Sequence, residues 1–136
     1  MSSSPSLVRV GRHVLHYEET LLRVQWVGVP TYAEQDEVYE RISEYLHAQG
    51  KILLLFDLRE AGPVDRKHRA AAAEWWRKAP LQSIALAHFG MIPVVRVLLS
   101  LMNRAVGLLS PTQPRIELFA TESEARAWLD RVKGEL

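Results

Sequence analysis

Residues 52–59 have the sequence ILLLFDLR, in which five consecutive apolar side chains precede a segment with both acidic and basic residues. An apolar run of this length, bounded by Gly50 and Asp57, is typical of a strand that other elements cover on both faces. We therefore expect a central strand at 52–56 and a loop at 57–63, with the other elements packed around the strand.

Shorter runs on either side of this strand alternate between apolar and polar residues or repeat at helical spacing. A β-hairpin is expected before it, from alternating runs at 13–18 and 21–27. Two of the helices begin with a capping box, in which a Thr and the Glu three residues later bond each other's backbone N–H groups. The expected helices are 31–49, 66–78, 94–109 and 121–133, and the further strands are 83–89 and 115–120.

The resulting order, β-β-α-β-α-β-α-β-α, predicts an α/β fold. Strands that alternate with helices pair in parallel through right-handed crossovers, whereas the opening hairpin adds an antiparallel edge. We expect a mixed, mostly parallel sheet of about five strands with four helices. The chain has 136 residues, 48% of them hydrophobic, and can bury a core of its own. We expect one domain at 12–136 after a flexible N-terminal segment at 1–11.

The composition excludes several kinds of site. The chain has no cysteine, which excludes disulfides, thiolate metal sites and cysteine nucleophiles. His13 and His16 are three residues apart on an expected strand and face opposite sides, so no metal or other cofactor is predicted. The N-terminus lacks a signal-peptide pattern and no segment is apolar for long enough to span a bilayer, so we expect a cytoplasmic protein.

Basic residues concentrate in the middle of the chain. Residues 61–115 carry eight Lys or Arg and two Asp or Glu, a net charge of +6, although the whole chain carries +1. The helix expected at 66–78 adds two Trp to this charge, which suits an anionic membrane surface. The alternative is a solvated basic face with Trp in an ordinary core. No pattern of a nucleic-acid-binding protein accompanies it. The predicted basic rim consists of Arg66, Lys67, Arg69, Trp76, Arg77 and Lys78.

The helix expected at 94–109 is apolar around most of its circumference. Its polar residues form one narrow stripe, whereas an ordinary surface helix needs an apolar face only about 100° wide. The excess predicts contact with an apolar ligand, a membrane surface or a second copy of the chain. The alternative is a helix enclosed within the monomer. The residues predicted to make this contact are Arg96, Leu98, Leu101, Met102, Arg104 and Leu109.

Asp57, Arg59, Glu60 and His88 lie at the ends of adjacent predicted strands. The carboxyl ends of parallel strands form the edge where open α/β sheets bind ligands. An Asp57–His88 pair could perform acid–base chemistry, but no nucleophile elbow, phosphate-binding loop or dinucleotide glycine pattern accompanies it. The alternative is that Asp57 holds a turn and that His88 is a strand-end residue with satisfied hydrogen bonds.

Three longer segments follow one another along the chain: GRHVLHYE at 11–18, LLLFDLR at 53–59 and RIELFATESEARAWL at 115–129. Together they resemble the STAS superfamily, and most closely its SpoIIAA-like branch, whose layout is similar to that of small CRAL-TRIO-type lipid-binding proteins. The resemblance implies a non-catalytic binding or regulatory module. In the anti-sigma-antagonist members a phosphorylatable Ser follows the residue matched by Asp57. Leu58 stands at that position here, so this switch is not expected.

These patterns lead to one functional hypothesis and two alternatives. We expect a cytoplasmic, non-catalytic module that binds an apolar ligand, or associates peripherally with a membrane, through the helix at 94–109. The first alternative is a STAS-type protein-interaction module without the Ser switch, acting as a homodimer or with a protein partner. The second alternative is an enzyme that uses Asp57 and His88.

Overall fold

The computed structural model describes residues 6–93, 97, 101 and 115–136. Three α-helices, six strands and two short 3₁₀ helices lie within these residues. In chain order they are β1 (Ser6–Val10), β2 (His13–Tyr17), β3 (Leu22–Gly28), α1 (Tyr32–Gln49), β4 (Ile52–Ala61), α2 (Arg66–Lys78), η1 (Leu81–Ser83), β5 (Ile84–Phe89), β6 (Arg115–Phe119), α4 (Glu122–Val132) and η2 (Lys133–Glu135). The helix predicted at 94–109 falls mostly outside the described residues.

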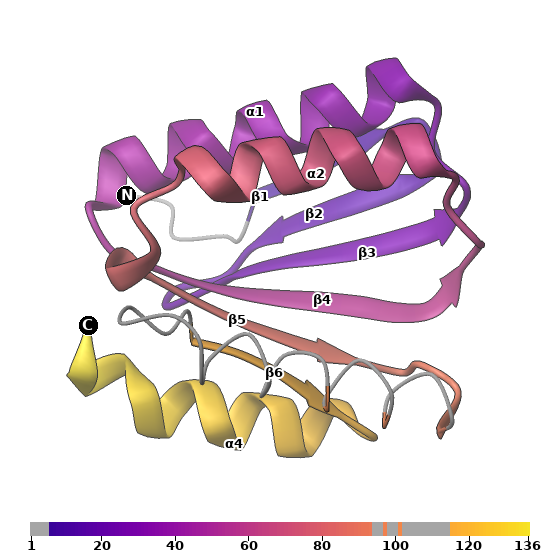
Figure 1. Ribbon diagram of the computed structural model, residues 1–136. Helices are drawn as coiled ribbons and strands as arrows, with labels where there is room; N and C mark the ends of the chain where they lie inside the picture. Colours follow the sequence, from indigo (N-terminus) through magenta and orange to yellow (C-terminus); the bar gives the residue numbers. More distant parts are fainter. Residues whose placement is uncertain (1–5, 94–96, 98–100, 102–114) are drawn as a thin grey trace.

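The strands form one sheet whose spatial order is the chain order, from β1 to β6 (Figure 1). β1, β2 and β3 are antiparallel neighbours, whereas β3, β4, β5 and β6 are parallel. β3 therefore pairs with the hairpin on one side and with the parallel strands on the other. The predicted α/β class and mixed sheet are confirmed, with six strands among the described residues where about five were expected.

The additional strand is β1, which corrects the expectation of a flexible segment over the whole of 1–11. Ser6–Val10 pairs with β2 along its length. Val10 is buried but Leu7 is exposed, so this edge strand is ordered by pairing with its neighbour more than by burial of its own side chains. The turn that follows is at Gly11, whose φ of 61° favours glycine.

β4 is longer than the apolar run that predicted it. The loop expected at 57–63 begins only after Ala61, because the strand keeps pairing with β3 as far as Gly28. Phe56 and Asp57 are still buried, whereas the last three residues of the strand are exposed. An exposed strand end is held by backbone hydrogen bonds and carries no apolar pattern, so the sequence does not indicate it.

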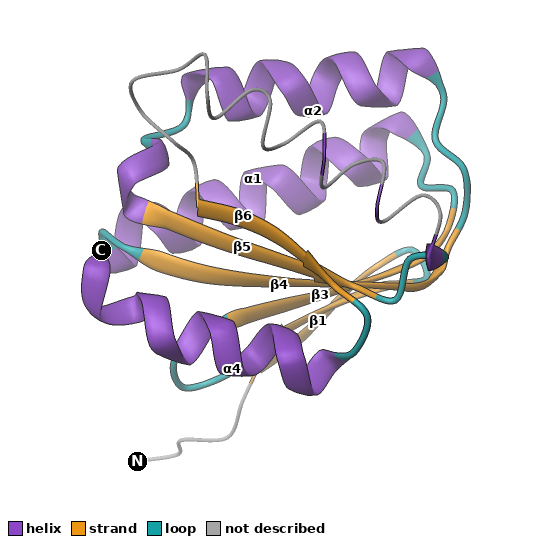
Figure 2. Cartoon of the chain, turned by 60° about the horizontal axis from the view of Figure 1, so that its bottom comes forward, coloured by secondary structure: helices purple, strands orange, loops and turns teal. Residues whose placement is uncertain are grey.

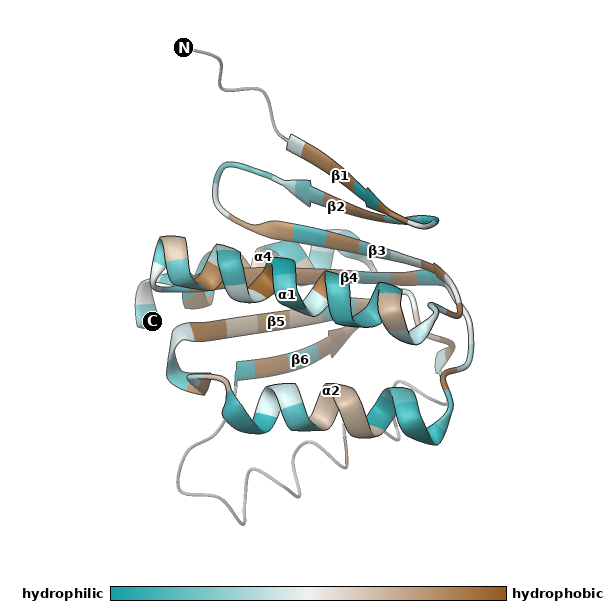
Figure 3. Cartoon of the chain, turned by 90° about the horizontal axis from the view of Figure 1, so that it is seen from above, coloured by the Kyte–Doolittle hydropathy of each residue, from teal (hydrophilic) through white to brown (hydrophobic). Residues whose placement is uncertain are grey.

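Alternate residues of β4 enter two cores on opposite faces of the sheet. Leu54 and Phe56 pack beneath α1 and α2, whereas Leu53 and Leu55 pack against α4 (Figure 2). Leu54 and Leu55 have no exposed surface, which confirms a central strand covered on both faces. Figure 3 shows hydrophobic residues along the strands that lie beneath α1.

α1 and α4 begin directly after the two Thr residues whose capping boxes the sequence predicts. Thr31 caps α1 and Thr121 caps α4, each in a complete capping box with the Glu three residues later. Asp65 caps α2, where the reciprocal partner is His68. Gly50 ends α1 with a φ of 81°. These contacts satisfy backbone groups that helix ends leave unpaired. The residues that make them are close together in the sequence, so the sequence alone can indicate where the helices begin and end.

Candidate functional site

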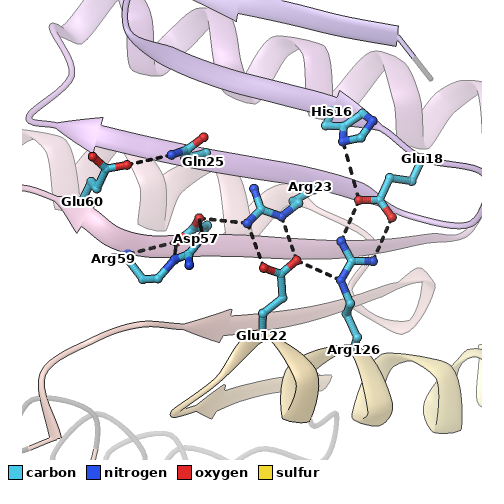
Figure 4. Close-up of polar contacts among 9 residues, drawn as sticks. All are labelled: His16, Glu18, Arg23, Gln25, Asp57, Arg59, Glu60, Glu122 and Arg126. Carbon is cyan, nitrogen blue, oxygen red and sulfur yellow. Dashed lines mark hydrogen bonds and ion pairs between the residues drawn. The ribbon is translucent and has the colours of Figure 1, made fainter. Parts of the chain in front are cut away.

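A network of ion pairs lies on the face of the sheet that α4 covers (Figure 4). At its centre is Asp57 of β4, which accepts hydrogen bonds from Arg23 of β3 at 2.9 Å and from the Arg59 guanidinium at 2.8 and 3.0 Å. Arg23 also donates to Glu122, at the start of α4, at 3.0 and 3.1 Å. β3, β4 and α4 are therefore tied together at one point.

Arg126 extends the network along α4. Its guanidinium donates to Glu122 at 2.9 Å and to both carboxylate oxygens of Glu18 at 2.7 and 2.8 Å. The hydrogen bond with Glu18 raises the pKa of Arg126. Guanidinium and carboxylate groups are equal in number here, so we interpret the network as a structural link between α4 and the sheet. Its members are Glu18, Arg23, Asp57, Arg59, Glu122 and Arg126.

Asp57 is the most buried member of this network, with 1% of its surface exposed. Burial acts to raise the pKa of its carboxyl group, but hydrogen bonds from Arg59 and the charge of Arg23 outweigh burial and lower the pKa. The carboxylate therefore stays charged at neutral pH, with Arg23 and Arg59 as its charged partners. Arg59 in turn lies over the ring of Phe89, 5.3 Å from its centroid.

Asp57 and His88 lie on opposite faces of the sheet, which corrects the expectation that they share one crevice. In the parallel register His88 is opposite Phe56, one residue before Asp57. The His88 and Phe56 rings meet on the face of α1 and α2 with centroids 5.4 Å apart, whereas Asp57 faces α4. Successive strand residues alternate, so this pair cannot share one acid–base step. Glu60 is exposed and accepts a hydrogen bond from Gln25 at 2.8 Å.

A pocket of about 580 Å³ opens on the face of α1 and α2, at the carboxyl ends of β3, β4 and β5. This edge is where open α/β sheets bind ligands. Short segments at 28–30, 61–64 and 90–92 contribute to its lining, together with side chains of α1 and α2. Apolar and aromatic side chains dominate the wall, among them Trp26, Tyr39, Phe56, Leu58, Met91 and Ile92.

Three polar side chains other than arginine contribute to the pocket wall, and two of them are already engaged. Gln35 donates to the backbone carbonyl of His68 at 2.9 Å. The His68 ring lies 2.7 Å from the Pro30 carbonyl and 2.8 Å from the Asp65 carboxylate. Nδ1 of His88 is buried and has no hydrogen-bond partner among the residues that the structure describes. Burial lowers the pKa of His88 to about 4, so its ring is neutral at pH 7.

Of the six residues predicted to form a basic rim on α2, the five cationic ones are exposed and Trp76 is not. Arg77 pairs with Glu74. Trp76, expected at the rim, is instead half-buried, and its Nε1 donates to the Tyr39 hydroxyl of α1 at 3.3 Å. Trp75 also packs against the core, so α2 docks on α1 through both indoles, which draws Trp76 inward. The exposed cations are Arg66, Lys67, Arg69, Arg77 and Lys78.

Most of the predicted contact residues of the helix at 94–109 lie outside the described residues. These are Arg96, Leu98, Met102, Arg104 and Leu109. Leu101 is described, has helical backbone and is 56% exposed. Within the part of the chain that the structure describes, no helix is long and apolar enough to cross a bilayer. Nor do three His, Asp or Glu side chains gather there as metal ligands.

Arg59 and His88 of the predicted strand-end crevice line the pocket. Its other walls were not predicted, because they come from segments far apart in the chain. Leu58 belongs to β4, Ala72 lies on α2, and Ile92 follows β5. Glycines at the strand ends were a local indication of the pocket opening. Gly28 and Gly90 have φ values of 67° and 91°, which mark sharp turns beside the opening.

Comparison with known proteins gives a family and a fold. The SpoIIAA-like family model matches residues 21–130. An uncharacterized DUF3478-family protein from Shewanella loihica PV-4, which has a SpoIIAA-like fold, is similar with a TM-score of 0.59 and 18% identity, over 95% of this chain and 98% of that one. The anti-sigma factor antagonist SpoIIAA in its unphosphorylated form is similar with a TM-score of 0.53 and 13% identity, over 96% of this chain and 99% of that one. None of the curated proteins matches the chain in sequence. Because the family model covers most of its length, this chain belongs to the SpoIIAA-like family.

Proposed function

We propose that this chain is a non-catalytic regulatory module that binds an apolar ligand in the pocket between the sheet, α1 and α2. The observation that carries the proposal is the pocket itself, with a volume of about 580 Å³ and a mainly aromatic and aliphatic wall. Small-molecule sites are mostly apolar and have volumes of about 300–1,000 Å³. The pocket also lies at the sheet edge that open α/β folds use for ligands.

The position of Leu58 supports a ligand site in preference to a phosphorylation switch. By the resemblance to STAS proteins, the residue after Asp57 is the one that would carry a phosphorylatable hydroxyl. Leu58 instead is half-buried, packs against the core beneath α1 and α2, and lines the pocket. This position therefore contributes apolar wall where a switch would need a hydroxyl group.

A pair of substitutions on α2 tests the pocket by filling it. Ala72 lines the pocket, whereas the next residue, Ala73, is exposed and does not. The probe is N-phenyl-1-naphthylamine, an uncharged apolar dye whose fluorescence rises in apolar surroundings. We expect saturable one-to-one binding by the wild type and by Ala73→Trp, and binding at least about tenfold weaker in Ala72→Trp, because the indole occupies the volume that the dye needs.

Circular dichroism confirms that each variant is folded before its dye titration is compared. Leu58→Phe, which adds volume from the opposite wall, replaces Ala72→Trp if that variant does not fold. The proposal is wrong if the wild type shows no saturable dye binding. It is equally wrong if the folded variant that fills the pocket, Ala72→Trp or its replacement Leu58→Phe, binds the dye as tightly as Ala73→Trp does.

A protein partner is the second candidate, because the SpoIIAA-like fold suggests a non-catalytic protein-interaction module and one similar structure is that of an anti-sigma factor antagonist. Light scattering measures whether the chain forms a homodimer. A tagged chain that retains a partner of defined mass at a one-to-one ratio, while binding no dye, would favour this candidate over the ligand site.

A further inference from the structure

The pocket carries positive charge and no negative charge on the described residues that line it. Arg59 and Arg69 belong to the lining, and neither Asp nor Glu does. Cations set in low-dielectric walls attract an anion more strongly than the same cations would in water. The composition of the wall therefore indicates the charge of the ligand as well as its apolar character.

Arg69 is the cation that can meet a ligand without breaking an ion pair. Arg59 is engaged, since its guanidinium donates to Asp57 at 2.8 and 3.0 Å. Arg69 donates to the backbone carbonyl of Val64 at 2.8 Å, and it forms no ion pair with any described residue. A guanidinium has five N–H donors, so most of the donors of Arg69 remain available.

Polarity changes along the depth of the pocket. Arg69 is exposed, whereas Trp26 and Phe56 are buried, with 8% and 4% of their surfaces exposed. His88 adds no charge at neutral pH, because burial lowers its pKa to about 4. The pocket is therefore apolar at depth and cationic where α2 meets solvent, and a ligand with one charged end and one apolar end matches this arrangement.

We propose that the ligand is an amphipathic organic anion, whose apolar body packs against Trp26 and Phe56 and whose carboxylate or phosphate group binds Arg69. This inference rests on the proposed function, since it assigns the chemistry of the same pocket. The planar guanidinium binds both kinds of group through paired N–H donors. Such an anion has two sources, a free organic acid and the headgroup of a membrane lipid.

Two ligands of equal chain length separate the effect of charge from that of apolar burial. Dodecanoate and 1-dodecanol are used to displace N-phenyl-1-naphthylamine at pH 8, below the concentrations at which they aggregate. We expect the wild type to bind dodecanoate about tenfold more tightly than 1-dodecanol, because one hydrogen bond to a charged group contributes about this much to the affinity. Arg69→Met should reduce the preference to about one without changing dodecanol binding. Arg77→Met alters another exposed arginine of α2, outside the pocket, and should keep the preference.

Vesicle sedimentation distinguishes the two sources. Binding to phosphatidylglycerol vesicles but not to phosphatidylcholine vesicles, lost in Arg69→Met, assigns the anion to a lipid headgroup. A dodecanoate preference without vesicle binding assigns it to a free acid, and either result supports the inference. Equal displacement by dodecanoate and dodecanol, or a preference that survives Arg69→Met, overturns it while the proposed function stands. Absence of dye binding to the wild type overturns both.

Discussion

Replacing Asp57 by Asn tests whether the charge network holds α4 to the sheet. Asp57 is 1% exposed and accepts hydrogen bonds from Arg23 and from three N–H groups of Arg59. Removing one partner of a buried ion pair costs about 3–5 kcal/mol. Here Arg23 keeps its two hydrogen bonds to Glu122, and Arg59, which is 58% exposed, can turn to solvent. We therefore expect the free energy of unfolding to fall by about 3 kcal/mol, at the lower end of that range.

Urea unfolding followed by circular dichroism measures this loss. Arg59→Met is the control, since it removes an exposed partner but leaves Asp57 paired with Arg23, and it should cost about 1 kcal/mol or less. The lowered pKa of Asp57 means that its contribution is present above the ordinary value of 3.8 and is lost as the pH falls below it. The difference between wild type and Asp57→Asn should therefore be complete at about pH 7 and shrink below about pH 4. Two results would refute this reasoning: a loss of less than about 0.5 kcal/mol for Asp57→Asn, or a loss for Arg59→Met that exceeds the loss for Asp57→Asn.

Three further changes test the packing around the sheet. Burial holds the pKa of His88 at about 4, below its ordinary 6.5, so the folded state binds fewer protons than the unfolded state between these values. The free energy of unfolding should therefore fall by about 3 kcal/mol as the pH drops from about 7 to 4. His88→Leu should remove this part of the pH dependence of urea unfolding. If the free energy of unfolding of His88→Leu depends on pH as steeply as that of the wild type, His88 is not its cause. Gly90 has a φ of 91°, and a Cβ there would lie 2.9 Å from a backbone N of β4. Gly90→Ala should thus lower the thermal midpoint through a loss of about 1–3 kcal/mol, whereas Gly134→Ala, which faces open space, should match the wild type. Thr121→Ala removes the N-cap of α4 and should cost about 1 kcal/mol in urea unfolding; an equal cost for the exposed neighbour Ser123→Ala would show that the cap is not the cause.

The two faces of the sheet differ in how their charges are used. On the face of α4, guanidinium and carboxylate groups are paired across β3, β4 and α4. On the face of α1 and α2, the described pocket lining holds two arginines and no carboxylate. Arg59 belongs to both, because it bonds Asp57 and also lines the pocket. We therefore expect charge changes on the α4 face to alter stability, and those near Arg69 to alter binding.

The sequence by itself determined the order of the elements and the face that most strand residues present. The alternation at 21–27 predicted a strand with one apolar face, and its alternate residues Leu22, Val24 and Trp26 are all buried beneath the same helices. Helix starts followed from capping residues a few positions apart. These features repeat every two residues in a strand or about every 3.6 in a helix, so a short window of sequence contains them.

Only the tertiary structure decided which distant side chains meet. Arg23 and Glu122 are separated by 99 residues, and nothing local in either segment indicates the other. The register of β4 against β5 sends Asp57 and His88 to opposite faces, although the sequence predicted both at strand ends. The pocket has the same origin, because its walls come from strand ends and helices that are distant in sequence. Register and helix docking depend on contacts between segments, and a pattern within one segment does not contain them.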